Sequence, residues 1–142
     1  MGMWLIYALL SAVTAALVAI FGKIGLKEID ANSATAIRAV IMALFLLGVV
    51  AVQGKFAQLG EIIAQRKAMS FIVLSGVAGA LSWLFYFLAL KGGKVAQVGS
   101  IDKLSVVIAV VLAFFFLGEK ISWVNAAGVA MIAAGAILAA LK

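Results

Sequence analysis

The sequence predicts an all-α integral membrane protein with five transmembrane helices. Hydrophobic residues make up 68% of the 142 residues and charged residues only 11%, whereas soluble domains average about 45–50% and about 25%. Long apolar stretches recur five times along the chain, each near the ~20 residues that cross a ~30 Å hydrocarbon core. Short polar joints separate these stretches. The chain has too few polar side chains to cover a water-soluble globule, so we expect one membrane domain.

Each element is assigned from its apolar run and the residues that flank it. The expected helices cover about residues 3–22, 33–52, 70–90, 95–117 and 122–141. The first run has no basic region ahead of it and is too long for the core of a signal peptide, so we interpret it as a retained helix. Asn32 and Ser33 are candidate caps of the second helix, and Ser122 is a candidate cap of the fifth. Gly118 is expected to end the fourth helix.

The joint over residues 53–69 is the longest in the chain. Apolar side chains recur in it at helical spacing, with charged and amide side chains between them. This pattern is typical of a short helix that lies in the plane of the membrane interface, which we expect over residues 55–67. Such a helix can act as a gate or a lipid sensor, and the simpler interpretation is a connector.

Five crossings place the two ends of the chain on opposite sides of the membrane. The basic residues of the N-terminal side are Lys55, Arg66, Lys67 and Lys120, and those of the other side are Lys23, Lys27, Lys91, Lys94 and Lys142. Orientation follows the excess of Lys and Arg in the cytoplasmic joints, and here the excess is a single residue. Insertion in both orientations is therefore expected, and with it an antiparallel dimer. The alternative is one orientation fixed by other cues.

Arg38, Asp102 and Lys103 are the ionisable side chains inside the expected spans. Each costs about 2.5–3.5 kcal/mol at a helix centre, which makes it a candidate for function. Arg38 and Asp102 lie at similar depth, about 12 Å from the same side at 1.5 Å per residue. We expect Asp102 to pair with Arg38, or with Lys23 at the end of the first helix, because neighbouring Asp102 and Lys103 point about 100° apart. A structural ion pair with a snorkelling lysine is the alternative.

The third expected helix carries two stripes that change from small to aromatic side chains. They are Ser75, Gly79, Ser82 and Tyr86, and Gly76, Ala80, Trp83 and Phe87. Residues at this spacing share a helix face, which suits either the wall of a cavity or close packing of helices. Ser82, Trp83 and Tyr86 are candidates to line a cavity. The fifth helix, rich in Ala and Gly, is expected to serve packing or dimerisation.

Composition excludes several classes of function. The sequence contains no Cys and no His, which removes disulfides, thiol chemistry and the commonest metal ligand. It contains no phosphate-binding glycine loop, no nucleophile set and no paired carboxylates, so we expect no enzyme, no catalytic residue, no cofactor and no metal. The net charge of +6 is spread over the joints without the basic block that a nucleic-acid partner requires.

Three parts of the chain carry a resemblance to a known family. They are Phe21-Gly22-Lys23-Ile24-Gly25-Leu26 with Ala36-Ile37-Arg38, then Trp83-Leu84-Phe85-Tyr86-Phe87-Leu88-Ala89-Leu90-Lys91, and Phe116-Leu117-Gly118-Glu119-Lys120-Ile121 with Gly128 and Gly135. In register over nearly the whole chain, they resemble a single EamA-type repeat of the drug/metabolite transporter superfamily. Typical members have two repeats of opposite topology, so the resemblance implies one half of an inverted-repeat (5+5) transporter fold. The chain departs from the family pattern at Leu104-Ser105-Val106, where many members have Leu-x-Pro.

The resemblance implies a function and a site. The function is transport of small polar or amphipathic metabolites by alternating access in an inner or plasma membrane, as an antiparallel homodimer. Trp83, Tyr86, Asp102 and Lys103 would line the cavity, and Ser82, Arg38 and Lys23 complete the candidate substrate and coupling-ion residues. Asp102 would bind a coupling ion, a proton or a substrate amine, and Lys103 a carboxylate or phosphate, so a zwitterion such as an amino acid suits the site. The alternatives are a small dual-topology ion channel and a non-transporting partner subunit.

Overall fold

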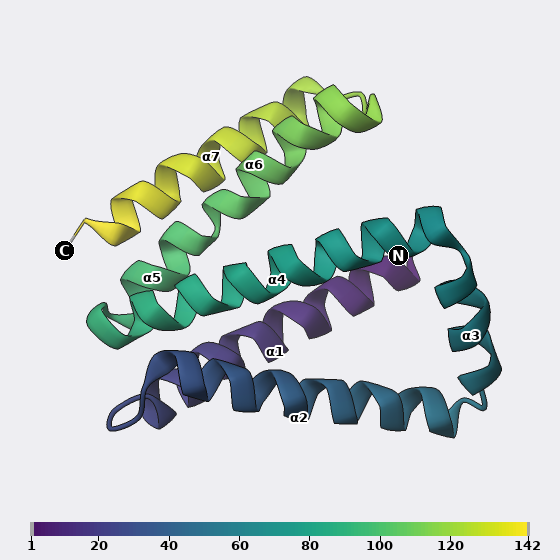
Figure 1. Ribbon diagram of the computed structural model, residues 1–142. Coiled ribbons are helices and arrows are strands. Elements are labelled where there is room, and N and C mark those ends of the chain that lie inside the picture. The colour runs from purple at the N-terminus through teal and green to yellow at the C-terminus, as the bar shows by residue number, and fades with distance from the viewer. Residues whose placement is uncertain (1, 142) are drawn as a thin grey trace. The chain divides into compact units, whose positions relative to one another are not determined.

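The computed structural model describes residues 2–141, in which α-helices and one π-helical segment are joined by short turns (Figure 1). The elements are α1 (Met3–Gly25), α2 (Ala31–Val52), α3 (Phe56–Ala64), α4 (Arg66–Gly92), α5 (Val95–Asp102), α6 (Leu104–Leu112), η1 (Ala113–Leu117) and α7 (Trp123–Ala140). Lys142, which the sequence counts among the basic residues of one side, lies outside the described residues.

Within residues 2–141, five helical segments are long and apolar enough to cross a membrane. They are α1, α2, α4, the run Val95–Leu117 and α7. Their large apolar side chains are mostly exposed, for example Phe45 on α2 and Phe71 on α4, as is expected where lipid rather than water surrounds a helix whose backbone groups bond internally. The predicted fold class, an all-α integral membrane protein with five spanning helices, is confirmed.

The chain forms two compact units. One consists of Gly25–Lys91, and the other joins the N-terminal residues through Ile24 to the chain from Gly92 onward. In the unit Gly25–Lys91, α3 connects the end of α2 to the start of α4 (Figure 1). In the other unit, α7 packs along α5 and α6.

Helix α2 begins at Ala31, because Asp30 caps it. The Asp30 carboxylate accepts a hydrogen bond from the Ser33 backbone N–H at 2.8 Å and another from the Ser33 hydroxyl at 3.0 Å. Asp30 itself is extended, with ψ 130°, which is the usual backbone of a cap residue. The expectation that Asn32 or Ser33 caps this helix is therefore wrong, since Ser33 is the donor that the cap satisfies.

Helix α2 ends in a Schellman turn. Gly54 has φ +66°, and the N–H groups of Gly54 and Lys55 donate to the carbonyls of Ala51 and Val50 at 2.9 and 3.1 Å. Glycine adopts this left-handed conformation without the clash that a Cβ causes. Helix α3 begins directly after this turn, at Phe56. It lies inside the range where the sequence predicts a helix in the interface plane. That α3 lies in this plane stays a prediction.

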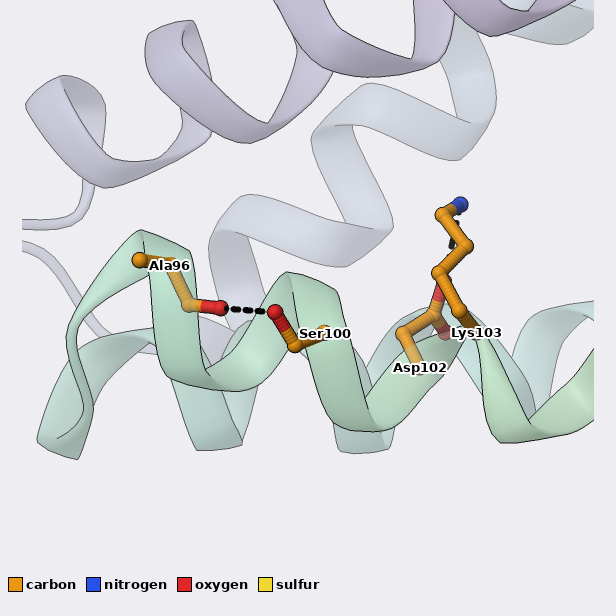
Figure 2. Close-up of polar contacts among 4 residues, drawn as sticks. All are labelled: Ala96, Ser100, Asp102 and Lys103. Atoms are coloured by element: carbon orange, nitrogen blue, oxygen red, sulfur yellow. Dashed lines mark hydrogen bonds and ion pairs between the residues drawn. The ribbon is translucent and has the colours of Figure 1, made fainter. Parts of the chain in front are cut away.

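The fourth spanning segment, expected as one helix over 95–117, is divided at Lys103. The Lys103 N–H donates to the Ser100 carbonyl, and the Val106 N–H donates to the Lys103 carbonyl, each at 3.1 Å. These are i→i−3 bonds, tighter than those of an α-helix. The Ser100 hydroxyl also donates to the Ala96 carbonyl at 2.6 Å (Figure 2), a back-bond that often bends helices.

The end of this segment and the start of α7 follow the predicted signals. η1 closes on Gly118, whose φ of +66° is left-handed, and the Glu119 N–H donates to the Ala113 carbonyl at 3.3 Å. The Ser122 hydroxyl accepts a hydrogen bond from the Asn125 N–H at 3.1 Å. Gly118 as the terminator of the fourth segment and Ser122 as the cap of the last helix are both confirmed.

Candidate functional site

In the unit Gly25–Lys91, the Arg38 guanidinium lies on aromatic rings of α4. Its central carbon is 3.6 Å from the centroid of the Trp83 ring and 5.0 Å from that of Phe87. Both distances are within the range of a cation–π contact. Arg38 projects from α2, so this contact joins the two spanning helices of the unit through a charge and its aromatic support.

The rings under Arg38 form a packed cluster. Trp83 meets Tyr86 edge to face at 5.6 Å and lies tilted against Phe87 at 5.9 Å, and Tyr86 meets Phe87 at 6.1 Å. Phe87 is buried, Trp83 and Tyr86 are half-buried, and Ser82 is exposed. Offset and edge-to-face pairs at these separations are the favourable arrangements of aromatic rings. The cluster therefore holds a fixed ring surface on which the guanidinium rests.

The aromatic contact offsets only part of the cost of placing Arg38 inside a span. A cation–π contact contributes about 0.5–2 kcal/mol, against about 2.5–3.5 kcal/mol for an arginine at a helix centre. Stacking also leaves the N–H donors unfilled, because they lie in the plane of the guanidinium and the rings lie against its face. Arg38 is half-buried, so its remaining N–H donors require acceptors from outside the cluster.

In the other unit, Asp102 pairs with its neighbour. The Lys103 Nζ lies 3.7 Å from Asp102 Oδ2, and Figure 2 shows both side chains at the break between α5 and α6. The sequence predicted that these side chains diverge and that Asp102 pairs with Arg38 or Lys23. Within its unit, Asp102 lies against Lys103, because the flexible four-carbon stem of a lysine lets its ammonium reach back to the adjacent carboxylate despite the 100° offset. Pairing of Asp102 with Arg38, which lies in the unit Gly25–Lys91, stays a prediction.

The Asp102–Lys103 pair is loose and accessible. At 3.7 Å the two charged groups attract each other without a direct hydrogen bond. The Lys103 side chain is 58% exposed and that of Asp102 is 38% exposed, so each keeps free surface for another group. A pair of this kind contributes about 1 kcal/mol or less where it is solvated. The two charges largely neutralise each other, and both remain available to a ligand.

Lys23 and Lys91 bind backbone carbonyls at the ends of the spans. Lys23 Nζ donates to the Gly93 carbonyl at 2.8 Å, and Lys91 Nζ donates to that of Ile29 at 3.1 Å. The Gly93 carbonyl directly follows α4, where a helix end leaves carbonyls without intrahelical partners, whereas the Ile29 carbonyl lies in the joint between α1 and α2. Lys23, a candidate substrate residue, thus fixes the turn that leads into α5.

The Asp30 carboxylate, outside the spans, is held in its charged form. The Ser33 backbone N–H and then the Ser33 hydroxyl lower the pKa of Asp30 from its ordinary value of 3.8, and Lys91 adds to this effect. Hydrogen bonds to the charged form favour it. This side of the unit therefore carries a fixed negative charge at the start of α2, where the helix dipole also favours an anion.

Two residues with clear contacts are missing from the predicted site. Phe87 supports Arg38, and Gln97 Nε2 donates to the Ala140 carbonyl at 3.3 Å. The depth of each residue in the membrane would have identified Trp83 as a partner of Arg38. Arg38 lies eight residues after Asp30, and Trp83 lies eight residues before Lys91. At a constant rise per residue the two are level. Gln97 has no such signal, since its partner is a backbone carbonyl near the chain end.

The small residues of the two α4 stripes include glycines that have free space beside them. A Cβ built on Gly76 or Gly79 would meet no heavy atom within 4 Å. Close packing within the unit therefore does not account for these two glycines. An open face of this kind can border a cavity or receive another helix, and both readings of the stripes stay predictions.

Comparisons with known proteins agree on one family. A family model described as the EamA-like transporter family matches residues 2–141. Among curated proteins, the chain is similar to an "Uncharacterized transporter in cobO 3'region" from Sinorhizobium sp, with 44% identity over 138 residues that cover 97% of this chain and 96% of that protein. No solved structure matches the chain. The likeness therefore extends over both units and all the spanning segments.

Proposed function

We propose that this chain, which belongs to the EamA-like transporter family, moves a small polar or amphipathic metabolite by alternating access, as an antiparallel homodimer. Family membership makes it a transporter with a small-molecule substrate, and it points away from an enzyme. Together with the five apolar spans, it also confirms the predicted localisation, a multi-pass integral protein of the inner or plasma membrane.

The observation that carries the proposal is the break in the fourth spanning segment at a charged pair. α5 ends at Asp102 and α6 begins at Leu104, about 12 Å along the helix from Lys94 at 1.5 Å per residue. Interrupted helices and charges at such depth mark substrate and ion sites in transporters, because both are costly in lipid. We assign Asp102 to a coupling ion, a proton or a substrate amine, and Lys103 to an anionic group.

The unit Gly25–Lys91 supplies apolar recognition in this proposal. Trp83 and Tyr86 offer ring faces that hold the apolar part of a metabolite, with Ser82 as a further polar candidate. A substrate with charges of both signs, such as an amino acid, suits the Asp102–Lys103 pair, which holds both signs of charge. Coupling to a proton gradient is part of the proposal, with Asp102 as the group that binds the proton.

The dimer follows from the odd number of spans and the balance of charge. One repeat of five helices needs a second copy of opposite orientation to rebuild an inverted-repeat transporter. The basic residues of the two sides differ by a single residue, so neither orientation is strongly favoured. Both orientations of one chain would then supply the two halves.

Transport by the purified protein tests this function. We expect protein in liposomes with an imposed proton gradient to take up at least one member of a panel of radiolabelled zwitterionic amino acids. Asp102→Asn should lower that uptake about 10- to 100-fold, the equivalent of one charge-assisted hydrogen bond. Glu61→Gln, which removes a carboxylate from α3 outside the spans, is the matched control and should leave uptake unchanged.

Other outcomes would reject the proposal. If the Asp102→Asn protein still takes up every zwitterion tested, the carboxylate does not have the role assigned to it. Ohmic current without a proton gradient favours the alternative of an ion channel, in which Lys103 attracts anions. No flux from the purified chain, together with copurification of a second membrane protein, favours a partner subunit.

A further inference from the structure

Arg38 differs from the other charges inside the spans in the partners it has. Asp102 and Lys103 face each other at 3.7 Å, whereas the Arg38 guanidinium rests on the rings of Trp83 and Phe87. Within the unit Gly25–Lys91, no carboxylate and no hydrogen-bond acceptor lies against it. Rings attract a cation but accept none of its N–H donors in the guanidinium plane. Arg38 is thus a positioned cation with open donors.

The packing around Arg38 fixes the direction of these donors. Phe87 is 4% exposed, and the Trp83 ring lies against both Phe87 and Tyr86, so the surface under the guanidinium cannot easily shift. Stacked arginine loses little further freedom when its rigid fork of N–H groups binds a planar anion. The rings therefore hold the guanidinium in one position with its donors pointing in a fixed direction.

We propose that Arg38, held on Trp83 and Phe87, binds the carboxylate of a singly charged organic anion or zwitterion that has an apolar body. This inference rests on the proposed function, because it names the substrate group that the transporter recognises. It assigns the carboxylate to Arg38 and leaves to Lys103, which has Asp102 at 3.7 Å, a second anionic group such as a phosphate.

Charge and shape favour a carboxylate over a phosphate. A single guanidinium balances one negative charge, whereas a phosphate monoester carries about −1.5 to −2 at pH 7. A carboxylate is planar and matches the guanidinium fork with two parallel hydrogen bonds. The half-buried Trp83 and Tyr86 rings offer apolar surface beside the anion, which suits a carboxylate attached to a hydrophobic group.

Trp83 provides a direct reporter of this site. The other tryptophans, Trp4 and Trp123, are 71% and 92% exposed, so we expect the fold to tolerate their replacement. Trp4→Phe and Trp123→Phe together leave Trp83 as the single tryptophan. In phosphatidylcholine liposomes, we expect benzoate to change the Trp83 emission saturably. Benzamide, its neutral isostere, should not. Arg38→Gln should abolish the response. Arg38→Lys should lower the affinity for benzoate at least about tenfold, because lysine cannot make the bidentate hydrogen bonds of a guanidinium.

Arg66→Gln is the matched control, because it removes an arginine from the start of α4 and should keep the full benzoate response. The proposal is overturned if benzamide acts like benzoate, if Arg38→Gln retains the response, or if inorganic phosphate outcompetes benzoate. It is also overturned if phosphatidylglycerol alone reproduces the Arg38-dependent change, because the ligand is then a lipid headgroup. The titration of the unmodified Arg38 protein decides the matter even if Arg38→Gln does not fold.

The outcome is separable from that of the proposed function. An Arg38-dependent benzoate response in a protein without flux supports the carboxylate site and rejects transport. Flux of carboxylate-bearing substrates that ignores Arg38→Gln supports transport and overturns this inference.

Discussion

Single charged residues at the membrane surface have defined hydrogen-bond partners, and Asp30 is the clearest case. Its carboxylate accepts both the backbone N–H and the hydroxyl of Ser33, which lowers its pKa. A carboxyl whose pKa is lower in the folded than in the unfolded state stabilises the fold above its ordinary pKa, and this contribution is lost as the pH falls through the lowered value. At neutral pH the start of α2 is therefore capped by a charge.

Titration of Asp30 tests this cap. We expect the Asp30 carboxyl carbon, followed by NMR in detergent micelles, to titrate below 3.8 in the folded protein. Ser33→Ala should raise the pKa toward 3.8 without reaching it, because the backbone N–H of residue 33 still donates. Below the lowered pKa, the first turn of α2 should exchange its amide protons faster. A pKa of 3.8 or above in the unsubstituted protein would contradict the assignment of Asp30 as the cap.

Residue-level reasoning from the sequence found the charges in the spans but not their contacts. Arg38, Asp102 and Lys103 stand out because ionisable groups are rare in apolar runs. The Asp102–Lys103 contact was missed because the prediction considered only the directions of the two side chains and not the reach of lysine, whose flexible stem brings its Nζ within 3.7 Å of the adjacent carboxylate. The place of Phe87 under Arg38 depends on how α2 packs against α4, which helical spacing within one segment does not contain.

At the scale of elements, the break between α5 and α6 is the feature that departs most from a regular span. Three local features act together there: the Ser100 back-bond to Ala96, the neighbouring Gly99, and the i→i−3 turn at Lys103. Glycine weakens a helix by about 0.5–1 kcal/mol relative to alanine. The segment is thus less stable in its middle than an unbroken apolar helix, which allows it to bend.

Gly99→Ala tests whether this weakness serves transport. A Cβ at Gly99 would meet no heavy atom within 4 Å, so we expect it to fit and to stabilise the segment by about 0.5–1 kcal/mol. Amides 100–106 should exchange more slowly, and the uptake rate should fall severalfold. Gly128→Ala on α7, where a Cβ also meets nothing within 4 Å, is the control. Equal effects of the two substitutions on uptake would show that the break has no special role.

Local sequence signals predicted some helix ends correctly and others wrongly. Gly118 and Ser122 were identified because glycine and serine have strong positional preferences at helix ends. The start of α2 was misplaced because Asp30, Asn32 and Ser33 all favour a cap position, and only the direction of the hydrogen bonds distinguishes the acceptor from the donor. The composition that predicts five spans is insensitive to such details.

At the scale of the whole molecule, we propose that one sequence inserts in both orientations and that the two forms pair. The basic residues give an excess of a single residue, Lys142 included, so no side is clearly cytoplasmic. The same balance makes the orientation easy to shift. Joint residues such as Gln58 and Gln65 offer places to add charge on the N-terminal side without touching a span.

The most direct test is the sidedness of the C-terminus in cells. The chain has no Cys, so a single cysteine added after Lys142 is the one thiol that a reagent can label. We expect a membrane-impermeant maleimide to label part of the protein from outside and the remainder only after the membrane is opened. Gln58→Lys with Gln65→Lys should move the population toward one orientation, because added basic residues favour the cytoplasmic side. Labelling of the unsubstituted protein from one side only would contradict the antiparallel homodimer.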